Sequence, residues 1–378
     1  MAFGEFDVYA FVSIQEGVRL RVLAVGIFFP AVSGVATAND VFAKLGVKKG
    51  LDIVKINMAG ELQESLGAFS FSKIVAVCAK YFLLYKVVFS DVVYVTPGQT
   101  FLGVMKYAPF ILVSKLLRKK VIFHVHGDYV HSQYQQLAGV RRFLYWYVIS
   151  RADAGVVLSD RLRRNLLPFL KPSSIFSVPN CVSNNLLTVN GLAEKKFDFP
   201  RLVFLSNLLT EKGIGELLHA VKMLKELNVK FELRIAGDID NKRKESFLES
   251  VSTYTEVEYL GVVRGEAKEE LLRWSNIFVL PTYFQMEGQP ISILEAMVMR
   301  NCIVTTEHAG IPDIVKEKIN GYFCEARSAE SLATTFRCCG EKMKEVEEIA
   351  SLNMNHARAI YTENRFLDDM YAVLCKTN

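Results

Sequence analysis

Hydrophobic residues occur along this chain in two alternating patterns, short unbroken apolar runs and longer stretches with helical spacing. A strand that is buried on both faces needs an unbroken apolar run, so each run predicts a parallel strand. The predicted strands are 19–26, 51–56, 92–95, 120–125, 154–158, 202–205, 231–238, 257–262 and 277–280. The main predicted helices are 72–88, 101–117, a helix from Asp160, 214–227, 266–274 and 290–299. This alternation predicts an α/β protein whose parallel sheets are covered by helices on both faces.

A polar stretch with little periodicity, residues 183–200, interrupts the alternation and predicts an interdomain linker. It separates a first domain, 1–182, from a second domain, 201–355, and residues 1–18 precede the first strand as an extension. The last stretch, 356–378, has the pattern of an amphipathic helix. Its apolar face is formed by Phe366, Met370, Val373 and Leu374. A chain of 378 residues is long enough for two domains that each bury a core.

The candidate chemistry begins where the strand 277–280 ends, at Pro281. A polar loop follows, and Pro290 suits the first turn of a helix because its missing N–H would have no partner there. The helix 291–299 is apolar on nearly every face, which predicts that it is buried all round. Glu295 lies in its middle, and a buried carboxylate costs several kcal/mol unless it is hydrogen-bonded.

A second carboxylate, Glu287, precedes the helix with seven residues between it and Glu295. The two acids bracket a helix N-terminus, where free N–H groups and the positive end of the helix dipole favour an anion. Phosphates on the amides of Gly288 and Gln289, with hydroxyls on the carboxylates, would together match a nucleotide sugar. A core glutamate neutralised by a neighbouring arginine or lysine is the open alternative.

Glu287 and Glu295 form an E-x7-E motif, and the surrounding FVLP, EGQP and LEAM segments resemble the donor site of retaining GT-B glycosyltransferases, glycosyltransferase family 4. The resemblance covers about residues 19–375 and is strongest at 201–325. It implies two facing Rossmann-like domains, with the donor site in the second and an acceptor cleft between them. It also implies that the helix in 356–378 packs back on the first domain.

The resemblance further implies roles for individual residues on the donor side. Glu295 would bind the ribose hydroxyls and Glu287 the hydroxyls of the sugar. The amides of Gly288 and Gln289, where Pro290 starts the helix, would hold the diphosphate.

Lys212, in a segment that resembles the E-K-G of the family, would place an ammonium group on the same diphosphate. Asn207 stands where the family usually has arginine. It can donate a hydrogen bond to the phosphates but supplies no charge. A D-x-D pattern at Asp238 and Asp240 belongs to metal sites of another glycosyltransferase fold, and we discount it here because a three-residue pattern is common.

On the first-domain side, Gly34 follows the first strand in a loop whose amides could approach a ligand closely. An ordinary tight turn is the alternative. The strand 120–125 ends in a His-Val-His-Gly segment, and the resemblance makes His126 the acceptor-side histidine that contacts the transferred sugar. A metal pair with His124, or a strand-end histidine that bonds only locally, are the other interpretations.

Composition and charge narrow the class of protein. Seven scattered cysteines without C-x-x-C spacing favour a reduced, cytoplasmic protein, and the acidic start of the chain does not resemble a secretion signal. Residues 1–200 carry 23 Lys and Arg against 13 Asp and Glu, whereas the remainder carries 22 against 27. Aromatic residues are interleaved with this basic excess. The pattern favours docking on an anionic membrane surface or an ordinary solvated cationic face, and we expect no nucleic-acid partner.

The resemblance therefore implies a retaining hexosyltransferase that transfers a sugar from a UDP- or GDP-sugar to a hydroxyl of a glycan or lipid-linked glycan. We expect no metal ion and no cofactor besides this co-substrate. Synthesis of cell-envelope or capsular polysaccharide at the inner face of the plasma membrane is the expected setting. A catalytically silent GT-B partner in an assembly complex is the main alternative, and a nucleotide-sugar epimerase is another.

Overall fold

The computed structural model describes residues 19–31, 33–59 and 77–377. It contains two six-stranded sheets, and every pair of neighbouring strands is parallel. The order in the first sheet is β2 (Asp52–Asn57), β1 (Arg21–Gly26), β3 (Val92–Val95), β4 (Lys120–Val125), β5 (Ala154–Val157) and β6 (Ile175–Ser177). The order in the second is β12 (Gly321–Cys324), β11 (Cys302–Thr306), β10 (Ile277–Leu280), β7 (Arg201–Leu205), β8 (Glu232–Ala236) and β9 (Val257–Tyr259). The predicted α/β class with parallel sheets is confirmed.

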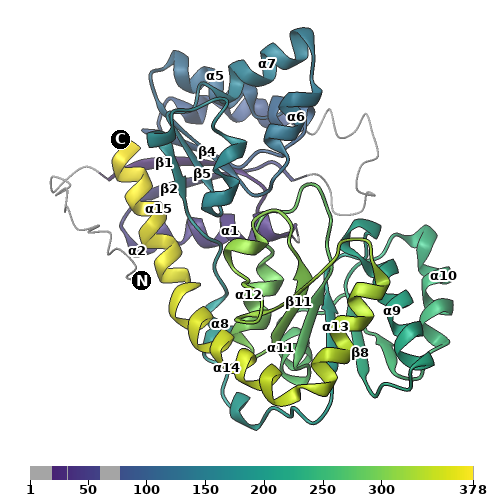
Figure 1. Ribbon diagram of the computed structural model, residues 1–378. Helices are drawn as coiled ribbons and strands as arrows, with labels where there is room; N and C mark the ends of the chain where they lie inside the picture. The colour runs from purple at the N-terminus through teal and green to yellow at the C-terminus, as the bar shows by residue number, and fades with distance from the viewer. Residues whose placement is uncertain (1–18, 32, 60–76, 378) are drawn as a thin grey trace.

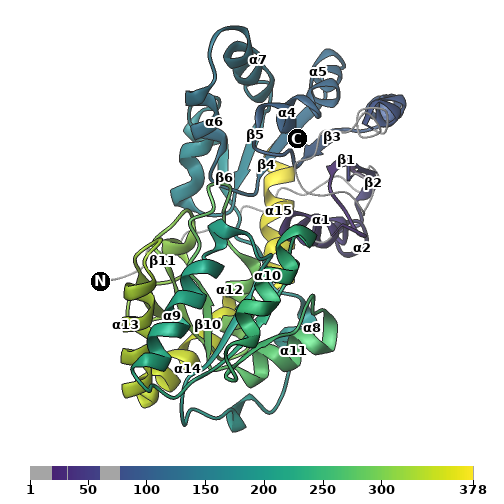
Figure 2. The same cartoon turned by 90° about the vertical axis from the view of Figure 1, so that its right-hand side faces the viewer.

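Helices cover both sheets (Figures 1 and 2). Those of the first half are α1 (Gly34–Ala43), α2 (Leu45–Lys48), η1 (Phe82–Val87), α4 (Phe101–Met105), α5 (Ala108–Leu116), α6 (Val130–Gln136), α7 (Gly139–Ile149), η2 (Asp160–Asn165) and η3 (Pro172–Ser174). Those of the second half are α8 (Asn184–Leu187), η4 (Leu192–Glu194), η5 (Thr210–Lys212), α9 (Ile214–Glu226), α10 (Asn241–Ser252), α11 (Gly265–Trp274), α12 (Ile291–Val298), η6 (Ile311–Asp313), α13 (Ala329–Glu341), α14 (Met343–Ile360) and α15 (Glu363–Thr377). Within the described ranges, none of these helices is both long and apolar enough to cross a bilayer.

The inner strands of the first sheet, β1, β3, β4 and β5, are buried on both faces, which is why they are nearly continuous hydrophobic runs. Leu23 and Val25 of β1 pack into the core on one face, and Val22 and Ala24 pack into the core on the other, as the two-residue period of a strand requires. The second of these cores includes the apolar face of α15. The C-terminal helix, yellow in Figure 1, therefore runs back along the first sheet and covers it.

Three predicted helices differ from the structure. The helix expected over 101–117 is two helices, α4 and α5, because Pro109 has no N–H to bond the carbonyl of Met105 and so interrupts the helical ladder. The helix expected from Asp160 is the 3-10 helix η2. Of the helix expected over 72–88, the part before residue 77 lies outside the described residues, and 82–87 is the 3-10 helix η1.

Residues 183–200 lie against the second sheet. Leu186 and Leu192 are buried in its core, and the buried ammonium group of Lys195 donates hydrogen bonds to the carbonyls of Leu272 and Met299 at 2.9 and 2.7 Å. This stretch therefore holds the C-terminal ends of α11 and α12 in place while it connects the two sheets.

Candidate active site

Two loops of the second domain meet at the carboxyl ends of β7 and β10, where parallel sheets place ligand sites. The loop after β7 carries Lys212 and the loop after β10 carries Glu287. The amide of Tyr283 donates to the carbonyl of Glu211 at 2.8 Å. Gly213 has a φ of 82°, and a side chain there would clash with the carbonyl of Pro281. This contact brings the two loops together backbone to backbone.

Lys212 and Glu287 form an ion pair in which Nζ lies 2.6 Å from Oε2. Thr282 donates its hydroxyl to the same carboxylate oxygen at 3.0 Å. The side chains of Lys212 and Glu287 are 13% and 9% exposed, so the pair is largely withdrawn from water. Separating two such charges is costly unless each gains a new polar partner. An anionic ligand on Lys212 and hydroxyl groups on Glu287 would supply those partners.

The second acid of the motif, Glu295, is paired in the same way. Its Oε1 accepts a hydrogen bond from Lys268 Nζ of α11 at 2.6 Å, and its side chain is 9% exposed. The structure therefore shows the arrangement that the alternative interpretation expected, a buried carboxylate neutralised by a neighbouring lysine. Lys268 was not identified from the sequence, because it is 27 positions from Glu295 and no local pattern indicates that the two residues meet.

The N-terminus of α12 lies between the two ion pairs. Pro290 is the residue that caps this helix, and the helix begins at Ile291. Across the described part of the chain, the amides of Gly288 and Gln289 have no hydrogen-bond acceptor. They are therefore available to an anion, as expected for a helix N-terminus.

The side chain of Gln289 has a different role from its amide. Its Oε1 accepts from the amide of Asn180 at 2.7 Å, and Asn180 Nδ2 donates to the carbonyl of Gln289 at 2.9 Å. Gln289 Nε2 also donates to the carbonyl of Leu158 at 3.4 Å. Gln289 thus ties the second domain to the end of the first. This function was not foreseen, and neither was that of Asn180.

The first domain approaches α12 through two further loops. A side chain at Gly288 would clash with the carbonyl of His126, so only glycine allows this approach of the two backbones. Gln99 Nε2 donates to the carbonyl of Met286 at 3.1 Å. A Cβ atom at Gly34 would lie 3.6 Å from Cδ1 of Ile291, which places the start of α1 beside the start of α12. His126, Gly34, Gly288 and Glu287 are thereby assembled at one site.

His126 lies on a second buried histidine. Its ring is stacked on that of His124, with 4.0 Å between centroids and 30° between planes. Burial lowers the pKa of His126 to about 3, and burial together with the nearby His126 ring lowers the pKa of His124 well below its usual value. Both rings are therefore neutral near pH 7.

The hydrogen bonds of the two histidines differ. The hydroxyl of Tyr94 and Nδ1 of His124 are hydrogen-bonded at 2.7 Å, which orients the inner ring. Both ring nitrogens of His126 are buried without a partner in the described structure. No three His, Cys, Asp or Glu side chains of the described residues are grouped as a metal site requires.

The remaining sequence-based candidates are not members of the two ion pairs. Asn207 is exposed, and in the described residues its side chain forms no hydrogen bond. Asp240 caps α10 by accepting from the amide of Lys242 at 2.8 Å. Asp238 accepts a backbone hydrogen bond from Leu208 through its carbonyl. The D-x-D pattern thus serves local structure.

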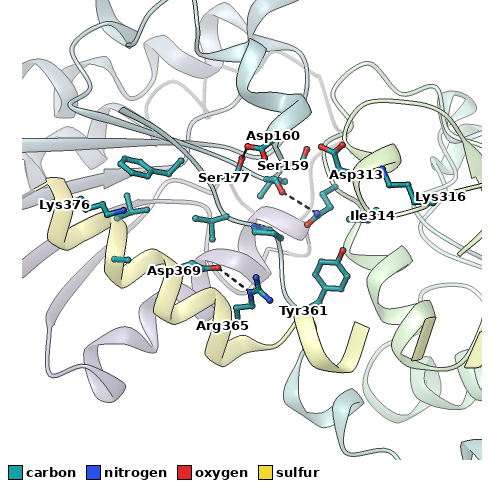
Figure 3. A pocket seen from close by; sticks show the side chains of 17 residues that line it. Ser159, Asp160, Ser177, Asp313, Ile314, Lys316, Tyr361, Arg365, Asp369 and Lys376 are labelled. Atoms are coloured by element: carbon teal, nitrogen blue, oxygen red, sulfur yellow. Dashed lines mark hydrogen bonds and ion pairs between the residues drawn. The ribbon is translucent and has the colours of Figure 1, made fainter. Parts of the chain in front are cut away.

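A cavity of about 550 Å³ opens beside Gln289, between α15 and the loop that contains η6 (Figure 3). Figure 3 shows Asp313 and Lys316 on one side, with Arg365, Asp369 and Lys376 along α15. The amide of Arg161 donates to Asp313 Oδ2 at 3.1 Å, a second tie between the domains. Glu287, Lys212, Glu295 and His126 do not line this cavity.

With this geometry established, the comparisons are informative. Residues 192–347 match the family model described as Glycosyl transferases group 1. The chain superposes on the Anabaena Alr3699/HepE structure in complex with UDP with a TM-score of 0.71 and 13% identity, covering 94% of this chain and 100% of that one. It superposes on sucrose-phosphate synthase from Thermosynechococcus elongatus with a TM-score of 0.73 and 13% identity, covering 95% and 99%. The fold is GT-B.

Curated relatives of this GT-B chain match a shorter region. Amylovoran biosynthesis glycosyltransferase AmsK of Erwinia amylovora is 28% identical over 139 residues, 35% of this chain and 34% of the relative. N,N'-diacetylbacillosaminyl-diphospho-undecaprenol alpha-1,3-N-acetylgalactosaminyltransferase of Campylobacter jejuni is 29% identical over 159 residues, 42% and 38%. The alignments span little more than a third of these relatives.

Proposed function

We propose that this protein is a retaining glycosyltransferase that moves a sugar from a nucleotide-diphosphate sugar to a hydroxyl of a glycan or lipid-linked glycan in cell-envelope or capsular polysaccharide synthesis. The observation that carries the proposal is the Lys212–Glu287 ion pair at the free N-terminus of α12, opposite His126. The match to Glycosyl transferases group 1 and the GT-B fold support glycosyl transfer as the reaction.

Donor binding would exchange the partners of the ion pair. The diphosphate binds the amides of Gly288 and Gln289 and takes Lys212 from Glu287. Glu287 then accepts hydrogen bonds from the hydroxyls of the sugar. Because every buried charge keeps a partner, the exchange avoids the cost of leaving an ammonium or a carboxylate unpaired. Glu295 and Lys268 receive the ribose hydroxyls beside it.

Transfer breaks the bond between the anomeric carbon and the diphosphate oxygen, and the electron pair leaves with the diphosphate. Lys212 and the α12 amides stabilise the charge that develops there, and Glu287 faces the positive charge on the sugar. The acceptor oxygen bonds to the anomeric carbon, and its proton passes to the departing diphosphate on the same face. These groups supply the charges that the proposal needs, so it invokes no metal ion.

His126 would hold the transferred sugar from the first-domain side. Its ring is neutral near pH 7 because burial lowers its pKa to about 3, so it can donate one hydrogen bond and accept another. A neutral ring also avoids repulsion with the positive charge that develops on the sugar. Gly34 lies beside the start of α12 and leaves room for the donor there.

The substrates are proposed from the relatives by class. Structural neighbours were solved with UDP and with UDP-glucose, which supports a uridine nucleotide sugar as donor. The Campylobacter relative is named for an acceptor linked to diphospho-undecaprenol, and the Erwinia relative for amylovoran biosynthesis. These names support a glycan or lipid-linked acceptor.

We also propose that the protein is cytoplasmic and docks on the inner face of the plasma membrane. Exposed apolar side chains gather on η1, α4, α5 and α7 of the first domain: Phe82, Tyr85, Leu102, Leu116, Val140, Phe143 and Trp146. Residues 77–152 contain ten Lys and Arg against two Asp. Apolar residues among cations suit an anionic bilayer surface.

A catalytically silent GT-B partner is the second candidate, because one observation favours it. Asn207 stands where an arginine is expected, and it is exposed and uncharged. Such a protein would bind its assembly partner without turning over a donor.

Calorimetry with UDP, GDP and their sugars, followed by transfer to a lipid-linked glycan panel, tests the proposal. We expect binding of one nucleotide class, release of that nucleoside diphosphate, and a product whose anomeric proton coupling matches the donor. Donor binding without turnover against any acceptor would favour the silent protein. An inverted anomeric centre would contradict the retaining mechanism.

A further inference from the structure

A second concave site lies in the first domain, outside the donor cleft. It is a groove of about 410 Å³ between α4, α6 and α7, a volume in the usual range for small-molecule sites. Its lining residues are Thr100, Phe101, Leu102, Gln133, Leu137 and Arg141. Leu102 is 66% exposed, so the groove presents apolar surface to a ligand.

The residue next to the start of this groove contacts the loop of the candidate active site. Gln99 directly precedes the lining residue Thr100, and it donates to the carbonyl of Met286, the residue before Glu287. Gln99 Oε1 also accepts from the amide of Tyr129 at 2.6 Å. Gln99 therefore links the first lining residue of the groove to the loop that carries Glu287.

The charge around the groove selects an anion. Arg141 lines it, and Arg142 follows on α7 with its guanidinium 4.5 Å from the ring centroid of Tyr134. Between residues 101 and 151 the chain has one acid, Asp128, which is paired with Arg164 and Asn165. An apolar floor beside unpaired guanidinium groups fits a hydrocarbon chain that carries a phosphate.

We propose that this groove binds the hydrocarbon chain of a lipid-phosphate-linked acceptor, with Arg141 on the phosphate. The proposal rests on the proposed glycosyl transfer and names the acceptor class for that site. An apolar segment of a partner protein is less well supported, because it would bring no phosphate for Arg141. The groove holds the acceptor so that its sugar meets His126 and Glu287.

The chain contains two tryptophans, and this allows a direct binding test. Trp146 lies on α7 one turn beyond Arg142, and Trp274 lies on α11 of the second domain. In a Trp274→Phe background, Trp146 fluorescence is titrated with geranylgeranyl phosphate as free monomer, with geranylgeraniol, and with inorganic phosphate. We expect saturable binding of geranylgeranyl phosphate, at least about tenfold tighter than of either fragment.

Leu102→Asp and Arg141→Ala should each weaken that binding about tenfold or more, because one places a carboxylate in the apolar floor and the other removes the phosphate partner. Leu167→Asp is the matched control. Leu167 is an exposed leucine of the first domain that does not line the groove, so this variant should bind as the parent does. Parent-like binding by Leu102→Asp, or equal binding of geranylgeraniol, would overturn the proposal.

The same protein is titrated with UDP by calorimetry, so that a failure of the groove proposal can be distinguished from a failure of the proposed donor site. UDP binding with no response to geranylgeranyl phosphate would contradict the groove proposal and support the donor site. A response to the prenyl phosphate without binding of any nucleotide removes the donor site and leaves the groove. If plain phosphatidylglycerol vesicles produce the same fluorescence change in the parent and in Leu102→Asp, the response reports general bilayer contact and the groove proposal is wrong.

Discussion

The two sides of the candidate active site differ in whether their buried polar groups have partners. On the second-domain side, Glu287 and Glu295 each have a lysine 2.6 Å away. On the first-domain side, both ring nitrogens of His126 are buried, and the described residues offer them no partner. The second side is built from charges that are neutralised before any ligand arrives. The first-domain side has a neutral ring whose nitrogens can form hydrogen bonds with a ligand.

This difference has a physical consequence for ligand binding. A charged ligand can bind the second side only by exchanging partners with an existing ion pair, which makes the affinity depend on charge. The first side loses no ion pair when it binds, so it discriminates by shape and hydrogen bonding. In the proposed complex, the charged diphosphate of the donor therefore suits the second-domain side, and the uncharged sugar suits the first-domain side.

The largest effect is expected when Glu287, the acid of the ion pair with Lys212, is removed. We expect Glu287→Ala to lower transfer by a factor of roughly 10² or more, because the positive charge on the sugar loses its partner. Release of nucleoside diphosphate measures this. Glu258→Ala, which breaks an exposed pair with Arg234, is the control and should turn over normally. Near-normal turnover in Glu287→Ala would remove the assigned role.

Removing Lys212, the other partner of this ion pair, tests stability and activity together. Lys212→Met should lower transfer roughly 10²-fold and lower the free energy of unfolding by about 3–5 kcal/mol, because Glu287 is left buried and unpaired. Lys225→Met, at a more exposed pair with Glu256, should cost at most about 1 kcal/mol.

Denaturant unfolding of a double variant, Lys212→Met with Glu287→Gln, sharpens this prediction. The double variant should regain most of the lost stability, since no charge is left unpaired, but none of the activity. If the single variant is as stable as the parent, the ion pair is not the buried interaction described here.

A smaller effect is expected on the first-domain side. His126→Asn should lower transfer roughly tenfold, since the sugar loses one positioned hydrogen-bond partner of a buried ring. The affinity for UDP, measured by calorimetry, should stay within about twofold, because the histidine does not contact the nucleotide in the proposed complex. A large fall in UDP affinity would show that the two sides do not divide the substrates in this way.

The second ion pair should affect binding more than turnover. Lys268→Met leaves Glu295 without its lysine, and we expect roughly a fivefold change in the KM for the donor with kcat little altered. Steady-state kinetics with varied donor separates the two parameters. A fall in kcat with an unchanged KM would move Glu295 from ribose binding to the chemical step.

The smallest expected effect concerns pH. Burial holds the pKa of His124 well below that of an unfolded histidine, near 6.5, so the unfolded chain binds a proton that the folded protein does not. Stability from this group is therefore complete above pH 6.5 and falls as the pH decreases, by about 1.4 kcal/mol per pH unit. Urea unfolding at pH 7 and pH 5 should show a smaller loss for His124→Asn than for the parent. An equal loss in both would contradict a neutral, buried His124.

Some features were predictable because they depend on neighbours in sequence. The strands β3 and β4 occupy 92–95 and 120–125 as predicted, since polar residues bound each apolar run. The break between α4 and α5 was also encoded locally, in Pro109, but the apolar pattern on both sides obscured it. The acids of the E-x7-E motif could be identified for the same reason.

The sequence by itself determined the parallel α/β elements, the buried helix α12 and the two acids of the motif, one before the helix and one in its middle, because hydrophobic period and turn residues act over a few positions. Only the tertiary structure decided which lysine neutralises which acid, that Gln289 reaches Asn180, and that His126 lies against Gly288. Lys212 and Glu287 are 75 positions apart. Their contact depends on how strand ends pack together, and no local pattern of residues records that arrangement.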